Sequence, residues 1–523
     1  MTAPTPGIVA AGHPATAHAG RIALEAGGNA VDAAVAAAFA SFTAESLLTD
    51  IGGGGYLMVA DTNAARVYDF FVRMPGLNSS AGGLDLRAVP IDFGGTTQHF
   101  QAGLGTAAVP GNVHGLCTAH EREGRIPLQE VLAPAIALAR DGVPFSESMQ
   151  RCLDVIAPIF ELTPSLAERI APNGTRLVPG DQLEIPHLAE LIEAIAQDGP
   201  RAFLEGEVAE AIVQICAEQG GRITRDDLLQ YSTVVRPALS RRLGATTLYL
   251  NTAPSPAGPL IGLAADLLDA MTTDDRKALG NLLAVFHAVG RARAEIVERL
   301  GATETWVEKL AEPDTLDLAR SLLVNSTGLP LEPAAPPSRG STTHISVVDG
   351  EGMAASVTTS NGEGSGILVP GTGIHLNNML GEEDVNPAGI GHLRPGSTLA
   401  SMMCPMILDH ADGTRTALGS GGSNRIRTAL VQVVLGMLDD PAHMADAIEA
   451  PRIHPDGVRV HLEPGFSVAD HVALEASGAT LEPWSERHLY FGGVHGAQRA
   501  AHGVLRGHGD SRRGGVTAKV HAD

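Results

Sequence analysis

The order of apolar and polar positions divides the chain into regions of different structure. Residues 7–60 combine short apolar runs with Ala-rich segments. Residues 112–325 repeat apolar side chains mainly at intervals of three and four, the period of a helix that packs on a core. After residue 342, β-branched and alternating positions dominate, which indicates strands. The pattern therefore predicts a long, mainly helical middle with strands near both ends.

The N-terminal region predicts a strand and two helices. Residues 7–11 read as the strand, and the first helix spans His13 to Ala26, where two glycines follow it. Asn29 is a suitable N-cap for a second helix that ends near Ala44. These elements place many small side chains in a core.

Four consecutive glycines, Gly52–Gly55, precede the next strand. No Lys-Ser or Lys-Thr pair follows them, and a strand rather than a helix comes next, so a Walker-type phosphate loop is disfavoured. Glycine lets a backbone approach its neighbours more closely than other residues allow. We therefore expect this run to pack against another segment.

The middle of the chain predicts helices that are interrupted once by strands. Two helices are expected between residues 112 and 141, and a capping arrangement at Thr224–Asp227 opens a short one. A strand pair is expected near Arg236–Leu250. Prolines then accumulate toward residue 341, so residues 326–341 are predicted to form an exposed linker.

The last third predicts paired strands and one buried helix. Thr343–Val348 and Met353–Thr359 read as a hairpin around a Gly-containing turn. Another strand is expected at Cys404–Leu408. A further strand from Thr416 runs into Gly421-Gly422-Ser423, and a helix follows from about Ile426 to Met437.

Composition narrows the functional class. The formal charge is −23, from 36 basic and 59 acidic residues. Nucleic acid and anionic membranes bind basic surfaces, so neither is an expected partner. No basic and apolar leader opens the chain, and no stretch of about 18 apolar residues occurs, so a cytoplasmic protein is expected. Neither a metal site nor a cofactor is predicted, because the four cysteines are far apart and His287 has no second ligand at a suitable spacing.

Thr342 carries the candidate chemistry. It follows the Pro-rich segment and directly precedes a predicted core strand. An N-terminal threonine can act as a nucleophile, because its own α-amine, with a pKa near ~8, can accept the hydroxyl proton. An internal threonine has no such base. The hypothesis therefore requires cleavage of the Ser341–Thr342 bond, and attack of the Thr342 hydroxyl on the Ser341 carbonyl would let the chain cleave itself.

Acyl transfer also needs donors for the oxyanion. Gly421-Gly422-Ser423 lies between a predicted strand and a predicted helix, where consecutive backbone N–H groups can serve. Considered separately, a Gly-Gly pair before a helix is usually only a turn. Its combination with Thr342 and the Pro-rich segment favours a catalytic site.

Several motifs resemble the γ-glutamyltransferase (γ-glutamyltranspeptidase, glutathione hydrolase) family of N-terminal-nucleophile hydrolases. The similarity extends over nearly the whole chain. The motifs that carry it are GGNAVDAAVA at 27–36, the glycine run at 52–55, TTHISVVD at 342–349, GIHLNN at 373–378 and GSGGS at 419–423.

The resemblance implies a catalytic set around Thr342. Thr342 would be the nucleophile and the first residue of a small subunit, 342–523, with residues 1–341 as the large subunit. The family has a second hydroxyl residue, which supports the nucleophile. It corresponds to Ser360 if the sequences are aligned without a gap, or to Thr359 if one residue is deleted. Asn361 would be the substrate-contacting amide only under the second alignment. Under both alignments, Gly422 is one of the two residues whose backbone N–H groups would bind the oxyanion. The other is either Gly421 or Ser423.

The implied substrate-binding residues depart from the family pattern. Ser401 matches one of two paired serines of the family, and Ala400 replaces the other. The family places an arginine after its Asp-Phe pair, whereas Phe71 stands there and Arg73 comes two residues later. An acidic pair follows Asn-Asn in the family; here Gly381 replaces the first acid, and Glu382 is the candidate for the second. Arg73 and Glu382 can equally be ordinary surface charges.

The resemblance implies an α+β fold, a four-layer αββα sandwich built from both subunits. It also implies an enzyme that cleaves γ-glutamyl amides, such as glutathione, through an acyl-threonine and passes the acyl group to water or an amine. Two alternatives remain. One is an acylase of the same class with another acyl group, for example a β-lactam side chain. The other is an unprocessed, non-catalytic scaffold.

Overall fold

The structure is a computed structural model of the 523-residue chain. It describes residues 3–79, 82–92, 97–301, 305–324, 341–382, 389–390 and 392–521. The predicted linker, 326–341, lies outside the described residues except for Ser341.

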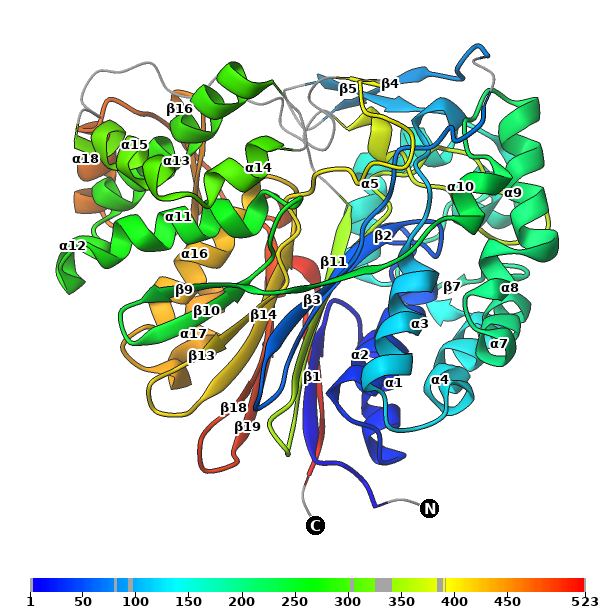
Figure 1. Cartoon of the computed structure of the whole chain (residues 1–523), viewed down its shortest axis with the longest axis horizontal. Helices are drawn as coiled ribbons and strands as arrows, with labels where there is room; N and C mark the ends of the chain where they lie inside the picture. Colours follow the sequence, from blue (N-terminus) through cyan, green and yellow to red (C-terminus); the bar gives the residue numbers. More distant parts are fainter. Residues whose placement is uncertain are drawn as a thin grey trace.

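Two antiparallel sheets form the centre of the molecule (Figure 1). The seven-stranded sheet has the order β20-β1-β11-β12-β2-β3-β8, and the six-stranded sheet has the order β19-β18-β14-β13-β10-β9. Their strands are β1 (Gly7–Ala11), β2 (Gly54–Ala60), β3 (Ala65–Phe70), β8 (Val234–Pro237), β9 (Leu239–Leu243), β10 (Thr246–Leu250), β11 (Thr342–Asp349), β12 (Ala354–Ser360), β13 (Met406–Asp409), β14 (Arg415–Gly421), β18 (Gly493–Arg499), β19 (Leu505–Gly509) and β20 (Val516–Val520).

Helices cover the outer faces of both sheets. The described helices of ten or more residues are α1 (Pro14–Glu25), α2 (Ala30–Ala44), α3 (Asn112–Glu123), α4 (Leu128–Asp141), α5 (Glu147–Phe160), α7 (Leu188–Asp198), α9 (Gly206–Glu218), α11 (Ala257–Asp269), α13 (Leu279–Leu300), α15 (Pro313–Val324) and α16 (Arg425–Met437). The shorter ones are α6 (Pro164–Ile170), α8 (Arg201–Leu204), α10 (Arg225–Leu229), α12 (Thr273–Lys277), α14 (Thr305–Leu310), α17 (Met444–Glu449) and α18 (Val468–Glu475).

The layers follow the expected αββα order. Helices α1, α2 and α3 pack on the seven-stranded sheet, α4 packs on α2, and α11 and α16 pack on the six-stranded sheet (Figure 1). Side chains from the two sheets meet between them: Ser356 Oγ of β12 donates to the Leu418 carbonyl of β14 at 2.8 Å. In the part of the chain that the structure describes, no helix is both long enough and apolar enough to span a bilayer.

Small sheets lie outside this core. They pair β4 (Arg87–Asp92) with β5 (Thr97–Ala102), β6 (Val143–Pro144) with β7 (Gln182–Leu183), and β15 (Ile453–Asp456) with β16 (Arg459–Leu462) and β17 (Thr480–Pro483).

The local predictions agree well with the observed elements. Asn29 caps α2 through a capping box with Asp32, and Thr224 caps α10 in the same way. The predicted hairpin is β11–β12, and α16 begins one residue before its predicted start. The prediction for residues 236–250 is confirmed as strands β9 and β10, with β8 directly before them.

The glycine run packs against β12, as its composition predicted. A β-carbon on Gly53 would lie 2.2 Å from the Ser360 carbonyl oxygen, and one on Gly55 would lie 2.3 Å from that of Thr358. Real β-carbons do not approach other atoms so closely. These glycines therefore allow β2 to approach the end of β12, where the candidate site lies.

Strands from both sides of the Ser341–Thr342 bond alternate in the larger sheet. β11 and β12, which follow the bond, lie between β1 and β2, which precede it. β20 then pairs with the other edge of β1. The two predicted subunits therefore share one sheet and one core.

Candidate active site

Thr342 is the first residue of β11, and strand alternation decides where its side chain points. Ser346, four residues on, faces the other sheet and donates to the His495 carbonyl of β18 at 3.1 Å. Because residues two apart share a face, Thr342 also points toward the space between the sheets. Thr343 points the opposite way, toward helix α2, where it donates to Glu45.

Ser360 lies directly opposite Thr342 in the β11–β12 pair. The Thr342 hydroxyl donates to Ser360 Oγ at 3.2 Å, and Ser360 Oγ donates to the Ser341 carbonyl oxygen at 2.6 Å. The Gly362 N–H donates to Ser360 Oγ at 3.0 Å, which holds that hydroxyl in place. The Ser360 hydroxyl thus links Thr342, the candidate nucleophile, to the Ser341 carbonyl that Thr342 would attack.

The same register excludes Thr359 from this position. Thr359 lies on the opposite face of β12, and its Oγ1 accepts a hydrogen bond from Thr49 at 2.9 Å. The ungapped alignment is therefore the one that fits the geometry. Asn361 is not brought to the cavity beside Thr342, because its amide donates to the His375 carbonyl at 3.0 Å.

The Gly421–Gly422 turn lies against the backbone of Thr342. β14 ends at Gly421, and a β-carbon there would lie 2.3 Å from the Thr342 carbonyl oxygen. The φ angles are +124° at Gly422 and +51° at Ser423, where α16 is about to begin. This turn brings Gly421 against the end of β11 and Ser423 into the wall of the cavity that Thr342 lines.

Arg513 is a site residue that the sequence did not indicate. Its Nη1 donates to the Thr342 carbonyl oxygen at 3.0 Å, although 171 positions separate the two residues. The guanidinium is buried, with the whole side chain close to the Gly421 turn. It can hold the first residue of β11 in position from the side opposite Ser360.

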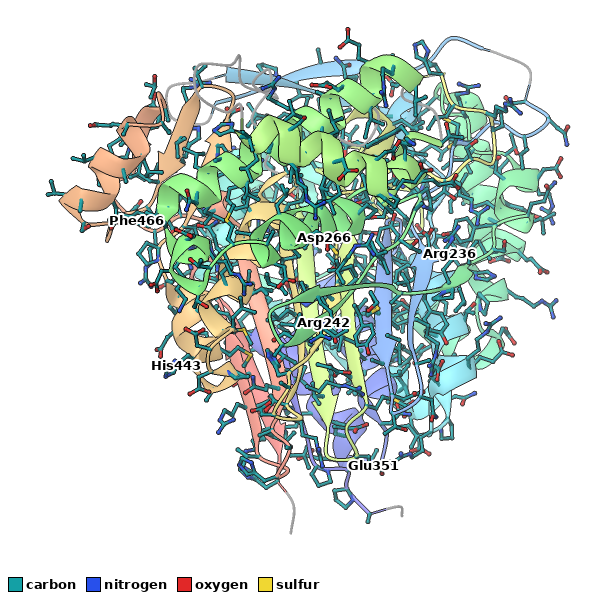
Figure 2. The ribbon with its side chains drawn as sticks, turned by 60° about the vertical axis from the view of Figure 1, so that its left-hand side comes forward. Arg236, Arg242, Asp266, Glu351, His443 and Phe466 are labelled. Atoms are coloured by element: carbon teal, nitrogen blue, oxygen red, sulfur yellow. The ribbon has the colours of Figure 1, made fainter. Side chains whose placement is uncertain are left out.

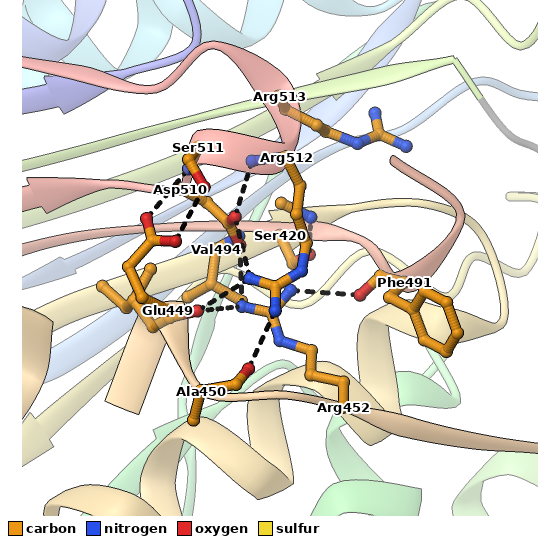
Figure 3. A network of polar contacts seen from close by, with 12 residues as sticks. Ser420, Glu449, Ala450, Arg452, Phe491, Val494, Asp510, Ser511, Arg512 and Arg513 are labelled. Carbon is orange, nitrogen blue, oxygen red and sulfur yellow. Dashed lines mark hydrogen bonds and ion pairs between the residues drawn. The ribbon is translucent and has the colours of Figure 1, made fainter. Parts of the chain in front are cut away.

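A buried ion network supports the turn that carries Arg513 (Figure 3). Asp510 accepts from Arg452 at 2.7 Å and from Arg512 at 3.1 Å, and Arg512 also pairs with Glu463 at 2.5 Å. Burial raises the pKa of Asp510, but the two arginines and backbone N–H donors outweigh it and lower the pKa to about 2. The turn is therefore fixed by charges that stay paired at neutral pH.

Glu45 supports β11 from the helical side. This buried residue directly follows α2 and accepts hydrogen bonds from Thr343 and, at 2.6 Å, from Thr16. Burial raises its pKa, while the two hydroxyls and the charge of Arg513 oppose that rise. Glu45 thus helps to position Thr342 through its hydrogen bond with the neighbouring Thr343.

A small cavity of about 20 Å³ lies beside Thr342. That volume holds about one water molecule. Its polar wall contains Ser360, Ser401, Ser423 and Glu382, and a β-carbon at Gly362 would lie 2.1 Å from Glu382 Oε1. The apolar part of the wall is formed by Phe71, Met379, Met402, Met403 and Ile426.

The structure does not bring Arg73 to this cavity. The Arg73 backbone pairs with Val109 and Thr398, and its side chain lines a separate cavity of about 490 Å³. Phe71, at the position where the resemblance implies an arginine, lines the Thr342 cavity instead. Arg73, a candidate for substrate binding, therefore lies outside the cavity that Thr342 lines.

The predicted residues thus divide into two groups. Thr342, Ser341, Ser360, Gly421, Gly422, Ser423, Ser401 and Glu382 come together, whereas Asn361 and Arg73 face elsewhere. The sequence did not indicate that Arg513 and the apolar residues of the cavity wall belong to the site. Their sequence contexts are those of ordinary core and turn residues, so only the convergence of distant segments shows them.

Comparison with known proteins identifies the family. A family-wide sequence model described as "Gamma-glutamyltranspeptidase" matches residues 16–520. This chain belongs to the γ-glutamyltranspeptidase family. Two similar relatives are named for different activities. The chain is 30% identical to the "Acylase ACY 1 proenzyme" of Pseudomonas sp. (strain SE83) over 491 residues, which cover 90% of this chain and 86% of the relative.

A second γ-glutamyltranspeptidase-family relative is the "Glutathione hydrolase proenzyme" of Escherichia coli (strain K12). It is 30% identical over 506 residues, which cover 90% of this chain and 85% of that protein. The crystal structure of cephalosporin acylase from Bacillus halodurans shares the fold, with a TM-score of 0.81, 23% identity and coverage of 99% and 97%. The predicted αββα fold and the N-terminal-nucleophile class are confirmed, and the chain is an amide-cleaving enzyme of this family.

Proposed function

We propose that this enzyme cleaves its own Ser341–Thr342 bond and then transfers acyl groups through an ester on Thr342. The observation that best supports this is the hydrogen-bond path from the Thr342 hydroxyl through Ser360 to the Ser341 carbonyl, at 3.2 and 2.6 Å. A donor on a carbonyl oxygen stabilises the negative charge that develops there during attack. In the uncut chain, the Ser341 carbonyl therefore precedes its candidate nucleophile, Thr342, and accepts a hydrogen bond from a polarising donor, Ser360.

Self-cleavage then proceeds by acyl transfer within the chain. Thr342 Oγ1 attacks the Ser341 carbonyl carbon, the C–N bond breaks, and the amide nitrogen takes up the hydroxyl proton. The resulting ester is opened by water, which leaves a carboxylate on Ser341 and a free α-amine and hydroxyl on Thr342. The cavity beside Thr342 has room for about one water molecule. The products are fragments 1–341 and 342–523.

Substrate turnover reuses the same hydroxyl. The new α-amine accepts the Thr342 proton, and the alkoxide attacks the substrate amide. Backbone N–H groups of the Gly421–Gly422 turn would stabilise the oxyanion. The amine product leaves with a proton, and water or a second amine then accepts the acyl group from Thr342. The partners are therefore a small amide and an acceptor molecule.

The cavity wall favours an acyl group that is less polar than γ-glutamyl. Five of its ten lining residues are Phe, Met or Ile. Phe71 occupies the position from which, by family resemblance, an arginine would bind the α-carboxylate. We therefore infer an acylase function, and the similarity to the Pseudomonas acylase supports it.

A γ-glutamyl group is the second candidate, and Glu382 is the observation that favours it. This carboxylate lies in the wall of the Thr342 cavity, against Gly362. A carboxylate there can bind the α-ammonium group of a γ-glutamyl substrate. The similarity to the Escherichia coli glutathione hydrolase supports this reading.

A denaturing gel tests the processing step. The purified wild-type protein should give fragments of about 35 and about 19 kDa, estimated from average residue mass. Thr342→Ala should remain one 54.1 kDa chain and should lose at least about 10⁴-fold in activity. A wild-type chain that stays intact after prolonged incubation would contradict the proposal and favour a non-catalytic scaffold.

A chromogenic assay separates the two acyl groups. The release of 4-nitroaniline is compared between a γ-glutamyl anilide and an uncharged acyl anilide of similar length. A higher kcat/KM for the uncharged substrate supports the acylase function. A higher value for the γ-glutamyl substrate supports the second candidate.

A further inference from the structure

A cavity of about 580 Å³ opens at the surface of the molecule and shares no lining residue with the small cavity beside Thr342. Small-molecule sites in proteins usually have volumes of about 300–1,000 Å³. None of the acyl-transfer steps proposed above uses a residue of its wall. The cavity is therefore a separate candidate for a ligand site.

Segments from the two predicted subunits form its wall. The large subunit contributes helix α6 and the segment around β7, and the small subunit contributes the turn 368–373. Arg169 of α6 donates through Nη2 to the Gly373 carbonyl of that turn at 2.5 Å. The Thr163 hydroxyl, directly before α6, donates to the Gly366 carbonyl at 2.9 Å. The wall is thus held in position before a ligand binds, which lowers the entropy cost of binding.

The positive charge of Arg169 is already compensated. Its side chain is 3% exposed, and its Nη1 lies 3.5 Å from Asp50 Oδ2. Burial raises the pKa of Asp50 to about 6, although the charge of Arg169 and two backbone N–H groups oppose the rise. At pH 8 both groups are therefore charged and paired. Among the described residues, no lysine and no second arginine line the cavity.

Two exposed carboxylates also line the cavity. Glu168 lies on α6, and Glu184 directly follows β7. Within the parts of the chain that the structure describes, neither side chain forms an ion pair or a hydrogen bond. An ionised carboxylate can only accept hydrogen bonds, and an ammonium group has three to donate. The unpaired charge of the wall therefore favours a cation.

A second part of the wall is apolar. It consists of Pro172, Pro186, Leu368, Val369 and Pro370. The alkyl stem of an organic cation is removed from water against such a surface, whereas a hydrated metal ion gains nothing from it. The described residues also contain no group of three or more His, Cys, Asp or Glu side chains that could hold a metal ion. The wall therefore fits an organic cation better than a metal.

We propose that this cavity binds an organic amine in its cationic form. The ammonium group lies at Glu168 and Glu184, and the apolar stem lies against the prolines and Leu368. Because both predicted subunits line the cavity, the amine contacts both of them. Binding does not require acyl transfer at Thr342, so this proposal and the proposed function can fail separately.

Calorimetric titration tests the site, with 1,6-diaminohexane as the probe. Adipate, which has the same number of carbons and the opposite charge, is the control ligand. Each is titrated at pH 8 into wild type, Glu168→Gln, Glu184→Gln and the double variant. Glu475→Gln is the control variant, because Glu475 is exposed on α18, at the opposite side of the molecule from β7 (Figure 1).

The diamine should bind wild type and Glu475→Gln equally. Its dissociation constant should rise about tenfold or more in the double variant, because charged hydrogen bonds are lost. Added NaCl should weaken binding to wild type, since exposed charges are screened by salt. Both carboxylates are exposed, so the substitutions leave the core intact.

Three outcomes would overturn the proposal. The first is that the diamine does not bind wild type. The second is equal binding of the diamine to wild type and to the double variant. The third is that adipate binds wild type as tightly as the diamine does. Smaller losses in the two single variants than in the double variant would support joint binding by Glu168 and Glu184.

Discussion

The two sides of the Thr342 site are built differently. The transfer corner, defined as Thr342, Ser360, Gly421 and Arg513, is held by contacts that involve the backbone of β11, β12 and β14. The recognition wall, defined as Phe71, Glu382, Ser401, Met402 and Met403, consists of side chains from three separate segments that line the cavity. Strand pairing fixes the corner, whereas side-chain identity defines the wall.

This difference is consistent with a family whose members are named for different activities. A change in the wall replaces one side chain by another and leaves the sheets intact. A change in the corner moves the backbone that carries the nucleophile. We therefore expect substitutions in the corner to abolish processing and substitutions in the wall to alter the choice of substrate.

After Thr342→Ala, the largest effect is expected for Gly421→Ala. The new β-carbon would lie 2.3 Å from the Thr342 carbonyl oxygen, so the end of β14 must move and take the backbone donors with it. The rate of self-cleavage, followed on denaturing gels, should fall about 10²- to 10³-fold. Gly280→Ala is the control, because the nearest atom to its β-carbon is 3.7 Å away. Wild-type cleavage in Gly421→Ala would show that the corner tolerates displacement.

Ser360→Ala should have the next largest effect. It removes the hydroxyl that accepts from Thr342 and donates to the Ser341 carbonyl, while the strand pairing remains. Loss of one oxyanion-type donor slows acyl transfer about 10²-fold or more. The half-time of self-cleavage measures this change. A variant that matures as fast as wild type would remove Ser360 from the transfer corner.

Glu382→Gln should change selectivity rather than overall activity. It removes the negative charge of the recognition wall and nearly preserves its shape. For γ-glutamyl anilide, kcat/KM should fall about tenfold, since a charged hydrogen bond contributes about 1.5–3 kcal/mol. For an uncharged acyl anilide it should change little. Equal losses for both substrates would mean that Glu382 supports the fold. Glu351→Gln, on the exposed turn of the β11–β12 hairpin, is the control (Figure 2).

The smallest effect is expected for Thr359→Ala, one residue from Ser360. It removes the hydrogen bond with Thr49 on the other face of β12. The free energy of unfolding should fall by about 1 kcal/mol, and self-cleavage should stay within about twofold of wild type. Denaturant unfolding is measured in the uncut Thr342→Ala background, so that a single chain unfolds. A processing defect as severe as that of Ser360→Ala would contradict the assigned register.

Apart from Arg513, the transfer corner could be predicted from the sequence because its signals are local. A hydroxyl residue before a β-branched run indicated Thr342, and consecutive glycines between a strand and a helix indicated Gly421 and Gly422. The choice between Thr359 and Ser360 depended on register, which follows from the hairpin pairing of Thr342 with Ser360. Once strand alternation is applied, only one of the two hydroxyls can face the nucleophile.

Ser401 and Glu382 of the recognition wall were predicted from the family resemblance, but its apolar members and Arg513 could not be predicted, because they depend on where distant segments meet. Phe71 looked like one more apolar residue after a strand, and Arg513 looked like a charge in a C-terminal turn. Arg73 was a candidate for substrate binding because it comes two residues after the position at which the family places an arginine. Pairing of its backbone with Val109 and Thr398 carries it into the separate cavity of about 490 Å³ instead. The spacing of residues along the sequence does not reveal this change in the direction of the backbone.

The alternation of strands in the larger sheet has a consequence for handling the protein. β11 and β12 lie between β1 and β2, so each edge of this hairpin is covered by residues from the other side of the Ser341–Thr342 bond. A 342–523 polypeptide expressed without its partner would present two open strand edges, which favours aggregation. Cleavage should therefore create new chain ends without creating two proteins that can be purified apart. The mature enzyme should be obtained only by expressing the whole precursor or both segments together.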